Sequence, residues 1–184
     1  MWVPDHDSTA GGEAADLAAS VGMVADPEQR LVLDAILAER AGRWAAFEAA
    51  VIAGRQNLKT WVLEVAALHD LVLRRVGRVV WTAHRYKTAQ DSFEALTNVF
   101  TNYDHLRRRV HKVTTAAGEQ GIRLLPRHSG PRVDFMARAG SMSGRGMTGD
   151  TVVLDEGLYL VGSIMGALIP TLSAVPDPQV RYGS

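Results

Sequence analysis

Apolar and polar positions along the chain follow two periods, one typical of strands and one typical of helices. Short runs rich in β-branched and aromatic residues indicate buried strands, whereas apolar residues three or four apart indicate amphipathic helices. The segments that predict strands are 47–53, Arg78–Ala83, 122–126, 132–138, Thr151–Leu154 and 179–182. The segments that predict helices are 27–42, 61–72, 88–100 and 159–172, and a short helix is expected from about Leu17.

Strands that alternate with helices predict an α/β fold with a mainly parallel central sheet flanked by helices on both faces. The chain has 184 residues, of which 47% are hydrophobic, and this is enough to bury one sizeable core. We therefore expect an N-terminal arm with a short helix over residues 1–26, followed by one domain over residues 27–184.

Composition narrows the classes of function. Cysteine is absent, which excludes disulfides and thiolate metal sites and favours a reducing compartment, and the six histidines lack metal-ligand spacing. The most apolar run, 158–169, is shorter than the roughly 20 residues of a membrane helix, so no membrane span is expected. The net charge is zero, but residues 74–132 hold twelve Lys or Arg against four acids, so the middle of the chain is suited to face an anion.

The stretch after the first predicted strand resembles a phosphate-binding loop. Such loops follow the pattern G-x-x-x-x-G-K-[ST], in which main-chain N–H groups and the lysine bind phosphates and the hydroxyl binds Mg²⁺. Lys59 and Thr60 stand at the last two positions, but Ala53 and Leu58 replace the glycines, and Gly54 comes one residue late. The alternative is an ordinary strand-to-helix turn with an exposed lysine.

A pair of acids follows the strand TVVL. An ATPase of this class needs one carboxylate on the Mg²⁺ side and a second to orient or deprotonate the attacking water. Asp155 is the candidate for the first role and Glu156 for the second, on a strand expected to neighbour the loop strand. The alternative is a core strand followed by a solvated acid pair. The order of loop, helix, strand and acids favours the ATPase hypothesis.

Three further features are compatible with nucleotide or DNA binding. The glycine-rich segment 141–150 carries Arg145, which is suited to reach a neighbouring subunit's γ-phosphate, although a surface loop explains it nearly as well. Gln29 is suited to bind the edge of a base, or simply to cap a helix. The basic run 107–109 with Lys112 suits phosphate contacts, or forms a solvated helix face.

Taken together, these residues resemble the ATPase domain of the large terminase subunit, the motor that packages DNA into tailed-phage and herpesvirus heads. The resemblance extends from Pro4 to Ser184 and is close to terminases of actinobacterial phages. Its carriers are the segments WVPDHDSTAGG, the Gln29 segment, GRQNLKT, VVWTAHRYKTAQDSF, SGRGMTGD, TVVLDE and PTLSAVPDPQVRYGS.

The resemblance implies roles residue by residue. Terminases replace the early loop glycines with an Arg-Gln pair, which matches Arg55 and Gln56, while Leu58 departs from the usual glycine. Glu156, Arg145 and Arg55 are implied to be catalytic, and Thr60 and Asp155 to bind Mg²⁺. The residues implied to bind ATP are Gln29, Gly54, Arg55, Gln56, Asn57, Leu58, Lys59 and Thr60. The family's coupling motif is implied to begin at Gly183 and Ser184.

The resemblance also implies an activity, partners and a location in the cell. It implies an ATP hydrolase, weaker as an isolated domain, that moves double-stranded DNA into a procapsid, with the family's nuclease half absent from this chain. The implied partners are the portal protein, the small terminase subunit and further copies in a ring, in the host cytoplasm and docked on the procapsid. The alternatives are a helicase-like ATPase and a hydrolysis-poor module that docks on the portal or the small subunit.

Overall fold

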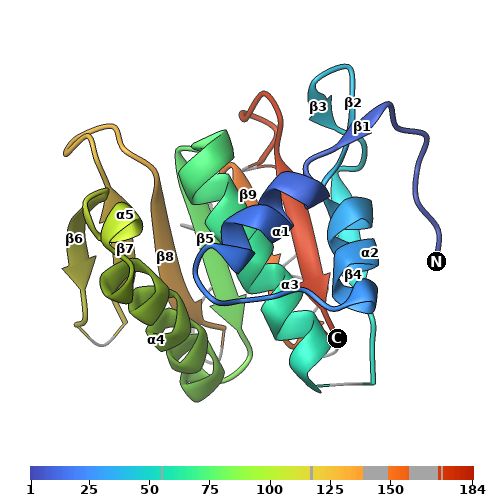
Figure 1. The fold of residues 1–184 in the computed structure, drawn as a ribbon. Coiled ribbons are helices and arrows are strands. Elements are labelled where there is room, and N and C mark those ends of the chain that lie inside the picture. Colours follow the sequence, from blue (N-terminus) through green and yellow to red (C-terminus); the bar gives the residue numbers. More distant parts are fainter. Residues whose placement is uncertain (55, 117, 139–148, 158–169, 171) are drawn as a thin grey trace.

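The computed structural model describes residues 1–184 except residues 55, 117, 139–148, 158–169 and 171. Its main strands are β4 Glu48–Val51, β5 Arg78–Ala83, β6 Val110–Thr114, β7 Gln120–Leu124, β8 Arg132–Ala137, β9 Thr151–Leu154 and β10 Gln179–Gly183. They form one seven-stranded sheet in the order β4-β10-β9-β5-β8-β7-β6 (Figure 1). The neighbouring strands β4, β10, β9, β5 and β8 are parallel to one another. The strands β7 and β6 continue the sheet with antiparallel pairing. The predicted α/β fold with a mainly parallel sheet is confirmed.

The helices are α1 Gly11–Ala19, α2 Pro27–Ile36, α3 Gln56–His69, α4 Tyr86–Asn102 and α5 Asp104–Arg107, with a π-helical turn, η1 Asp70–Arg74, after α3. Figure 1 shows α3 and α4 on one face of the sheet, with α1 packed on α3. None of the helices in the described ranges is both long and apolar enough to cross a membrane.

Both faces of the central strands are buried, as their apolar sequences require. On one face, Trp81 and Phe135 pack with Phe93 of α4 and with residues of α3. On the other face, Val80 packs with Leu172 and with apolar residues of β9 and β10. The predicted helix over 159–172 lies almost entirely outside the described residues.

Several elements have the expected bounds, but the first forty residues differ. The first helix begins at Gly11 rather than near Leu17. Its buried face consists of small residues, which give a weak apolar signal, and a Cβ on Gly11 would lie 2.6 Å from the Asp34 Cα, so the glycine permits close packing on α2.

The helix predicted over 27–42 ends earlier, at Ile36. A capping box between Asp26 and Gln29 and Pro27 at the first helical position start it as expected. After it, β2 Ala38–Arg40 and β3 Arg43–Trp44 form a hairpin, and β2 also pairs with β1 Ser8–Thr9. Ala41 and Gly42 have φ values of 52° and 74°, the left-handed pair that a tight hairpin turn requires.

The strand β10 lies inside the sheet, next to the edge strand β4. β10 separates β4 from β9 and pairs in parallel with both. The expectation that the acid-bearing strand neighbours the loop strand is therefore wrong. Pairing β10 between them brings a third strand end into the region where the loop and the acids lie.

Candidate functional site

The loop and the acids lie at the same edge of the sheet because β4, β10, β9 and β5 are parallel and end together. The end of β10 is bonded to the loop: the Ser184 N–H donates to the Val51 carbonyl (2.9 Å), and the Ala53 N–H donates to the Ser184 carbonyl (3.1 Å). A Cβ on Gly183 would lie 2.7 Å from the Leu63 Cδ1 and 3.2 Å from the Asp155 Oδ1. Glycine at this position therefore lets β10 pass closely between the loop helix and the acid strand.

Helix α3 begins at Gln56, followed by Asn57, earlier than the sequence pattern suggested. Leu58, Lys59 and Thr60 therefore lie in the first two turns of the helix. Leu58 has helical backbone geometry, for which a Cβ is no obstacle, and its side chain packs against an apolar cluster. The first N–H groups of a helix have no partner within the helix, so the start of α3 is suited to bind an anion.

Gly54, the glycine of the loop, is surrounded by open space rather than by packed atoms. Gly54 is exposed, and a Cβ built on it would meet no atom within 4 Å. The fold itself therefore does not require glycine at this position. An uncovered main chain beside a helix N-terminus is accessible to a phosphate. Arg55, the next residue, lies outside the described residues.

Four ionisable side chains, those of Lys59, Glu64, Asp155 and Glu156, lie in this region. Asp155 is 5% exposed, and burial raises its pKa, with the Glu156 charge acting in the same direction. The Lys59 charge lowers the Asp155 pKa, less than the Arg138 charge does, which agrees with the position of both residues at this edge of the sheet. Burial raises the pKa of Glu64 to about 8, and the Asp155 charge adds to the rise. A positive charge near these carboxyls would favour their ionised forms, so the region is suited to a cation.

Glu156 points toward a different helix. Its carboxylate accepts hydrogen bonds from the Arg85 N–H (3.1 Å) and the Thr88 hydroxyl (3.3 Å), at the start of α4. Because α4 follows β5, these donors lie on the side of β9 away from β4. Glu156 also has a φ of 54°, in the left-handed region that few residues other than glycine adopt. The structure thus places Glu156 at the correct sheet edge, with its carboxylate bound away from the loop.

Arg138, directly after β8, lies beneath the two acids. It is 5% exposed, and its guanidinium donates to the main-chain carbonyls of Asp155 and Glu156 and to Thr82. Burial lowers the pKa of Arg138, and the charges of Asp155 and Glu156 act against this shift.

The remaining sequence candidates are not gathered at this site. The Oε1 of Gln29 accepts the Asp26 N–H at 2.9 Å, so the amide oxygen serves the helix cap. Arg145 lies outside the described residues. In the basic run, Arg107 pairs with Asp104 at 2.7 Å and Arg109 donates to the Val72 carbonyl at 3.2 Å, so both contribute to the fold at the far end of the sheet.

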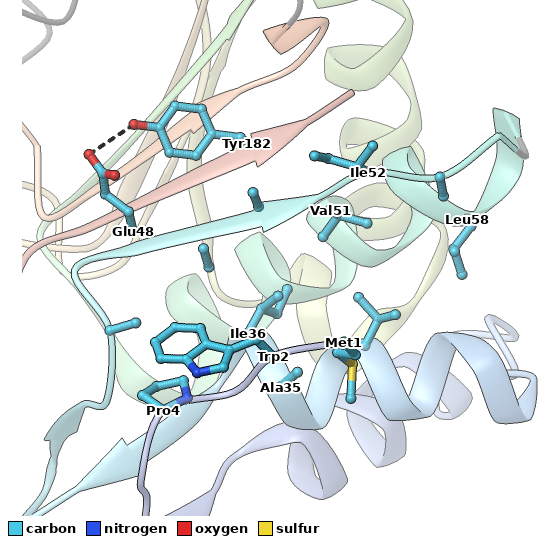
Figure 2. Close-up of a pocket in the computed structure, with 15 residues that line it drawn as sticks. Met1, Trp2, Pro4, Ala35, Ile36, Glu48, Val51, Ile52, Leu58 and Tyr182 are labelled. Atoms are coloured by element: carbon cyan, nitrogen blue, oxygen red, sulfur yellow. Dashed lines mark hydrogen bonds between the residues drawn. The ribbon is translucent and has the colours of Figure 1, made fainter.

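An apolar pocket of about 600 Å³, which the sequence did not reveal, lies beside the loop. Figure 2 shows its walls: Trp2 and Pro4 of the arm, Ala35 and Ile36 of α2, and Val51, Ile52 and Leu58 near the loop. At one end, the Tyr182 hydroxyl donates to the Glu48 carboxylate at 3.1 Å. Burial and the Glu48 charge raise the pKa of Tyr182, so this hydroxyl remains a donor.

Sequence reasoning also missed Glu64, Arg138 and Thr88. The first two carried a weak signal. Glu64 is the one acid in the helical run QNLKTWVLEVAALH, one turn after Thr60, and Arg138 directly follows the strand β8 at the sheet edge where the acids lie. Thr88 gave none, because a threonine in a helix start is ordinary.

The donor set fits a nucleotide with Mg²⁺. The helix start of α3, Lys59 and the open main chain at Gly54 suit phosphates, and Thr60 and Asp155 supply oxygens of the kind Mg²⁺ prefers. Among the described residues, no group of three His, Asp or Glu suited to a metal occurs.

Comparison with known proteins connects this geometry to solved structures. No family model matches the chain, and no curated protein matches it. The large terminase of bacteriophage HK97 superposes with a TM-score of 0.79 at 20% identity, covering 96% of this chain and 38% of that protein.

Two further large terminases give the same picture. The ATPase domain of the Thermus phage P74-26 large terminase superposes with a TM-score of 0.69 at 18% identity, covering 90% of this chain and 67% of that domain. The large terminase of a thermophilic bacteriophage, solved in complex with ADP, gives a TM-score of 0.53 at 8% identity over 74% of this chain and 32% of that one. The chain thus spans about two fifths of the HK97 protein, and its fold is the α/β P-loop fold of the large terminase ATPase domain.

Proposed function

We propose that this chain is the ATPase motor domain of a viral large terminase, which hydrolyses ATP to move double-stranded DNA into a procapsid. The observation that supports the proposal is that the start of α3, which carries Lys59, and the end of β9, which carries Asp155, lie at the same edge of a terminase-like sheet. The ADP bound by the large terminase of the thermophilic bacteriophage supports a nucleotide ligand.

The phosphates are held by the main-chain N–H groups of the loop and by Lys59, with Gly54, Arg55, Gln56, Asn57 and Leu58 forming the loop. Thr60 and Asp155 would hold Mg²⁺, which would neutralise charge on the phosphates. The buried Asp155 carboxylate would gain a counter-charge from that cation. The apolar pocket beside Leu58 receives the base. The resemblance assigns Gln29 to the adenine side, although its amide oxygen caps α2 in this structure.

In this scheme Glu156 orients the attacking water and takes its proton as the bond between the γ-phosphorus and the bridging oxygen breaks. Its carboxylate must first leave the Arg85 N–H and the Thr88 hydroxyl. Arg55, in the loop, and Arg145, from a neighbouring copy, stabilise the charge on the transferred phosphoryl group. Basal hydrolysis is therefore slow until a neighbour and DNA engage.

The partners follow from this role. Double-stranded DNA is contacted through its phosphates, so binding is sensitive to salt and indifferent to sequence. The domain works in a ring of copies with the portal protein and the small terminase subunit, in the host cytoplasm and transiently on the procapsid.

The test is binding of a fluorescent ATP analogue with Mg²⁺ to the purified chain. Lys59→Ala is expected to weaken binding about 10-fold to 100-fold, because a charged hydrogen-bond donor to phosphate is lost. Lys87→Ala is the matched control, since Lys87 is 87% exposed and lies on another helix. Equal binding by wild type and Lys59→Ala, or no binding by either, would overturn the proposal.

Hydrolysis is tested separately with Glu156→Ala, which is expected to bind the analogue normally and to hydrolyse ATP about 10²-fold to 10⁴-fold more slowly. A wild-type chain that binds ATP without measurable turnover, even with DNA and at high concentration, would instead support the docking-module alternative. The hydrogen bonds of Glu156 to α4 are the observation that keeps this alternative open.

A further inference from the structure

Resting on the proposed ATPase function, we infer that Arg138 is a positioning residue that holds the peptide groups of both acids, Asp155 and Glu156, in register with the nucleotide. Arg138 leaves β8 at its carboxyl end, one strand beyond β5, and reaches under β5 to the end of β9. Its side chain is buried, at 5% exposure, so it acts through other protein groups.

The geometry of the guanidinium carries the inference. Nη1 donates to the Thr82 carbonyl (2.9 Å) and to the Thr82 hydroxyl (2.8 Å). Nη2 donates to the Asp155 carbonyl and to the Glu156 carbonyl (3.1 Å). One rigid fork thus ties two successive carbonyls of the acid pair to the neighbouring strand β5.

This fork acts where the backbone needs support. Glu156 has a φ of 54°, a conformation that is unfavourable for a residue with a Cβ and persists only when its surroundings impose it. The Asp155 N–H also donates to the Thr82 carbonyl (2.8 Å), and the Glu156 N–H donates to the Asp155 Oδ1 (2.8 Å). Thr82 and Arg138 together therefore fix both peptides that carry the acids.

A lysine at position 138 is the informative substitution. It keeps one positive charge under the acids but loses the planar fork, so it cannot hold two carbonyls and Thr82 at once. A catalytic group displaced by about 1 Å loses on the order of 10²-fold in rate. Charge alone would preserve activity in Arg138→Lys, whereas positioning predicts its loss.

The experiment compares wild type, Arg138→Lys and the control Arg132→Lys, which changes an arginine of the same strand that faces Asp134. Thermal unfolding, single-turnover hydrolysis, and fluorescent ATP analogue binding with and without Mg²⁺ are measured on the whole chain. We expect Arg138→Lys to fold and to bind the analogue without Mg²⁺ within about threefold of wild type. Its hydrolysis should be about 10-fold to 100-fold slower, and it should lose most of the Mg²⁺-dependent gain in affinity.

The outcomes separate this inference from the proposed function. If Arg138→Lys hydrolyses ATP and responds to Mg²⁺ as wild type does, Arg138 has a purely structural role and the inference is overturned while the ATPase proposal stands. The inference is also overturned if the Mg²⁺-free affinity falls as much as the rate, because a general loss of structure then explains both. If wild type does not bind the analogue, or Lys59→Ala binds it equally well, both proposals fail together.

Discussion

Two buried acid clusters lie at opposite ends of the same central strands, and they are built in opposite ways. At the amino ends of β9 and β10, Asp70 is fully buried and accepts hydrogen bonds from Arg181 (2.8 and 3.1 Å) and from Thr151 (2.9 Å). Burial pushes the Asp70 pKa upward, but Arg181 and His69 outweigh it, so the pKa lies below its ordinary value. This carboxylate is ionised and fully partnered.

At the carboxyl ends of these strands, burial raises the carboxyl pKa values and cationic partners do not outweigh it. Burial raises the pKa of both Asp155 and Glu64, and each lies close enough to other acids for the charges to repel. Arg138 donates hydrogen bonds to the main-chain carbonyls of Thr82, Asp155 and Glu156 rather than to these carboxylates. A satisfied ion pair stabilises one fold, whereas acids left without a full counter-charge are typical of a site that binds a cation.

The largest expected effect is at the amino-end cluster. Arg181→Met should lower the free energy of unfolding by about 3–5 kcal/mol, because it leaves Asp70 as an uncompensated buried charge. Urea denaturation measures the loss. Asp155→Asn, the equivalent change at the other end, should not lower stability, since it removes a charge that burial already disfavours.

The double variant Arg181→Met with Asp70→Leu provides the control for this contrast. Replacing both partners removes the unpaired charge, so a substantial part of the lost stability should return. Equal destabilisation by Arg181→Met and Asp155→Asn would refute the distinction between a structural and a functional cluster.

The next largest expected effect is the pH dependence of the free energy of unfolding that Glu64 causes. Glu64 has a folded-state pKa of about 8 against an ordinary value of 4.5, so between these values the folded chain keeps a proton that the unfolded chain has lost. The associated stability is fully present below pH 4.5 and is lost as the pH rises through about 8. Allowing for solvent contact, the loss should be on the order of 2 kcal/mol.

The measurement is the free energy of unfolding from about pH 5 to about pH 9 in nucleotide-free and Mg²⁺-free buffer. Glu64→Gln should lack this decline, and it should be more stable than wild type at the upper end. Glu119→Gln is the control, because Glu119 is exposed. Parallel pH profiles for wild type and Glu64→Gln would show that Glu64 ionises normally in the folded chain.

The sequence anticipated one of these clusters and missed the other for a physical reason. The strand Thr151–Leu154 is buried throughout, so its apolar run and the acids after it could be read directly. Asp70 and Arg181 are 111 residues apart and meet only because β10 inserts beside β9. No local pattern encodes that insertion, and the same is true of Arg138 under the acids.

Local patterns also failed where strands are very short. β1 and β3 have two residues each, which is too few for any periodicity, and their pairing depends on the turn at Ala41 and Gly42. Leu58 illustrates the opposite case. A motif-based comparison treats it as an obstacle to phosphate binding, but the helix starts early enough to accommodate its side chain. Backbone geometry, rather than residue identity, decides whether the loop is accessible.

A smaller effect tests the apolar pocket on the loop side of the functional cluster. Ala35→Leu adds bulk to the wall of this pocket and should weaken ATP analogue binding about 10-fold, through steric overlap with the base. Inorganic triphosphate, which lacks a base, should bind equally to both proteins. Ala19→Leu, on the exposed end of α1, is the matched control. If triphosphate affinity falls with ATP affinity, the substitution disturbs the loop and the pocket does not hold the base.

The smallest expected effect concerns the hydrogen bonds that hold the Glu156 carboxylate against the start of α4. Thr88→Val removes the hydroxyl that donates to this carboxylate at 3.3 Å and preserves the shape of the side chain. Since these donors hold the carboxylate on the side away from the loop, basal ATP hydrolysis should rise about threefold when one of these two hydrogen bonds is lost. Thr101→Val on the same helix, whose hydroxyl bonds only carbonyls of α4, should leave the rate unchanged. A slower Thr88→Val enzyme would mean that the α4 donors align Glu156 for catalysis, and the geometry seen here would then be close to the reactive one.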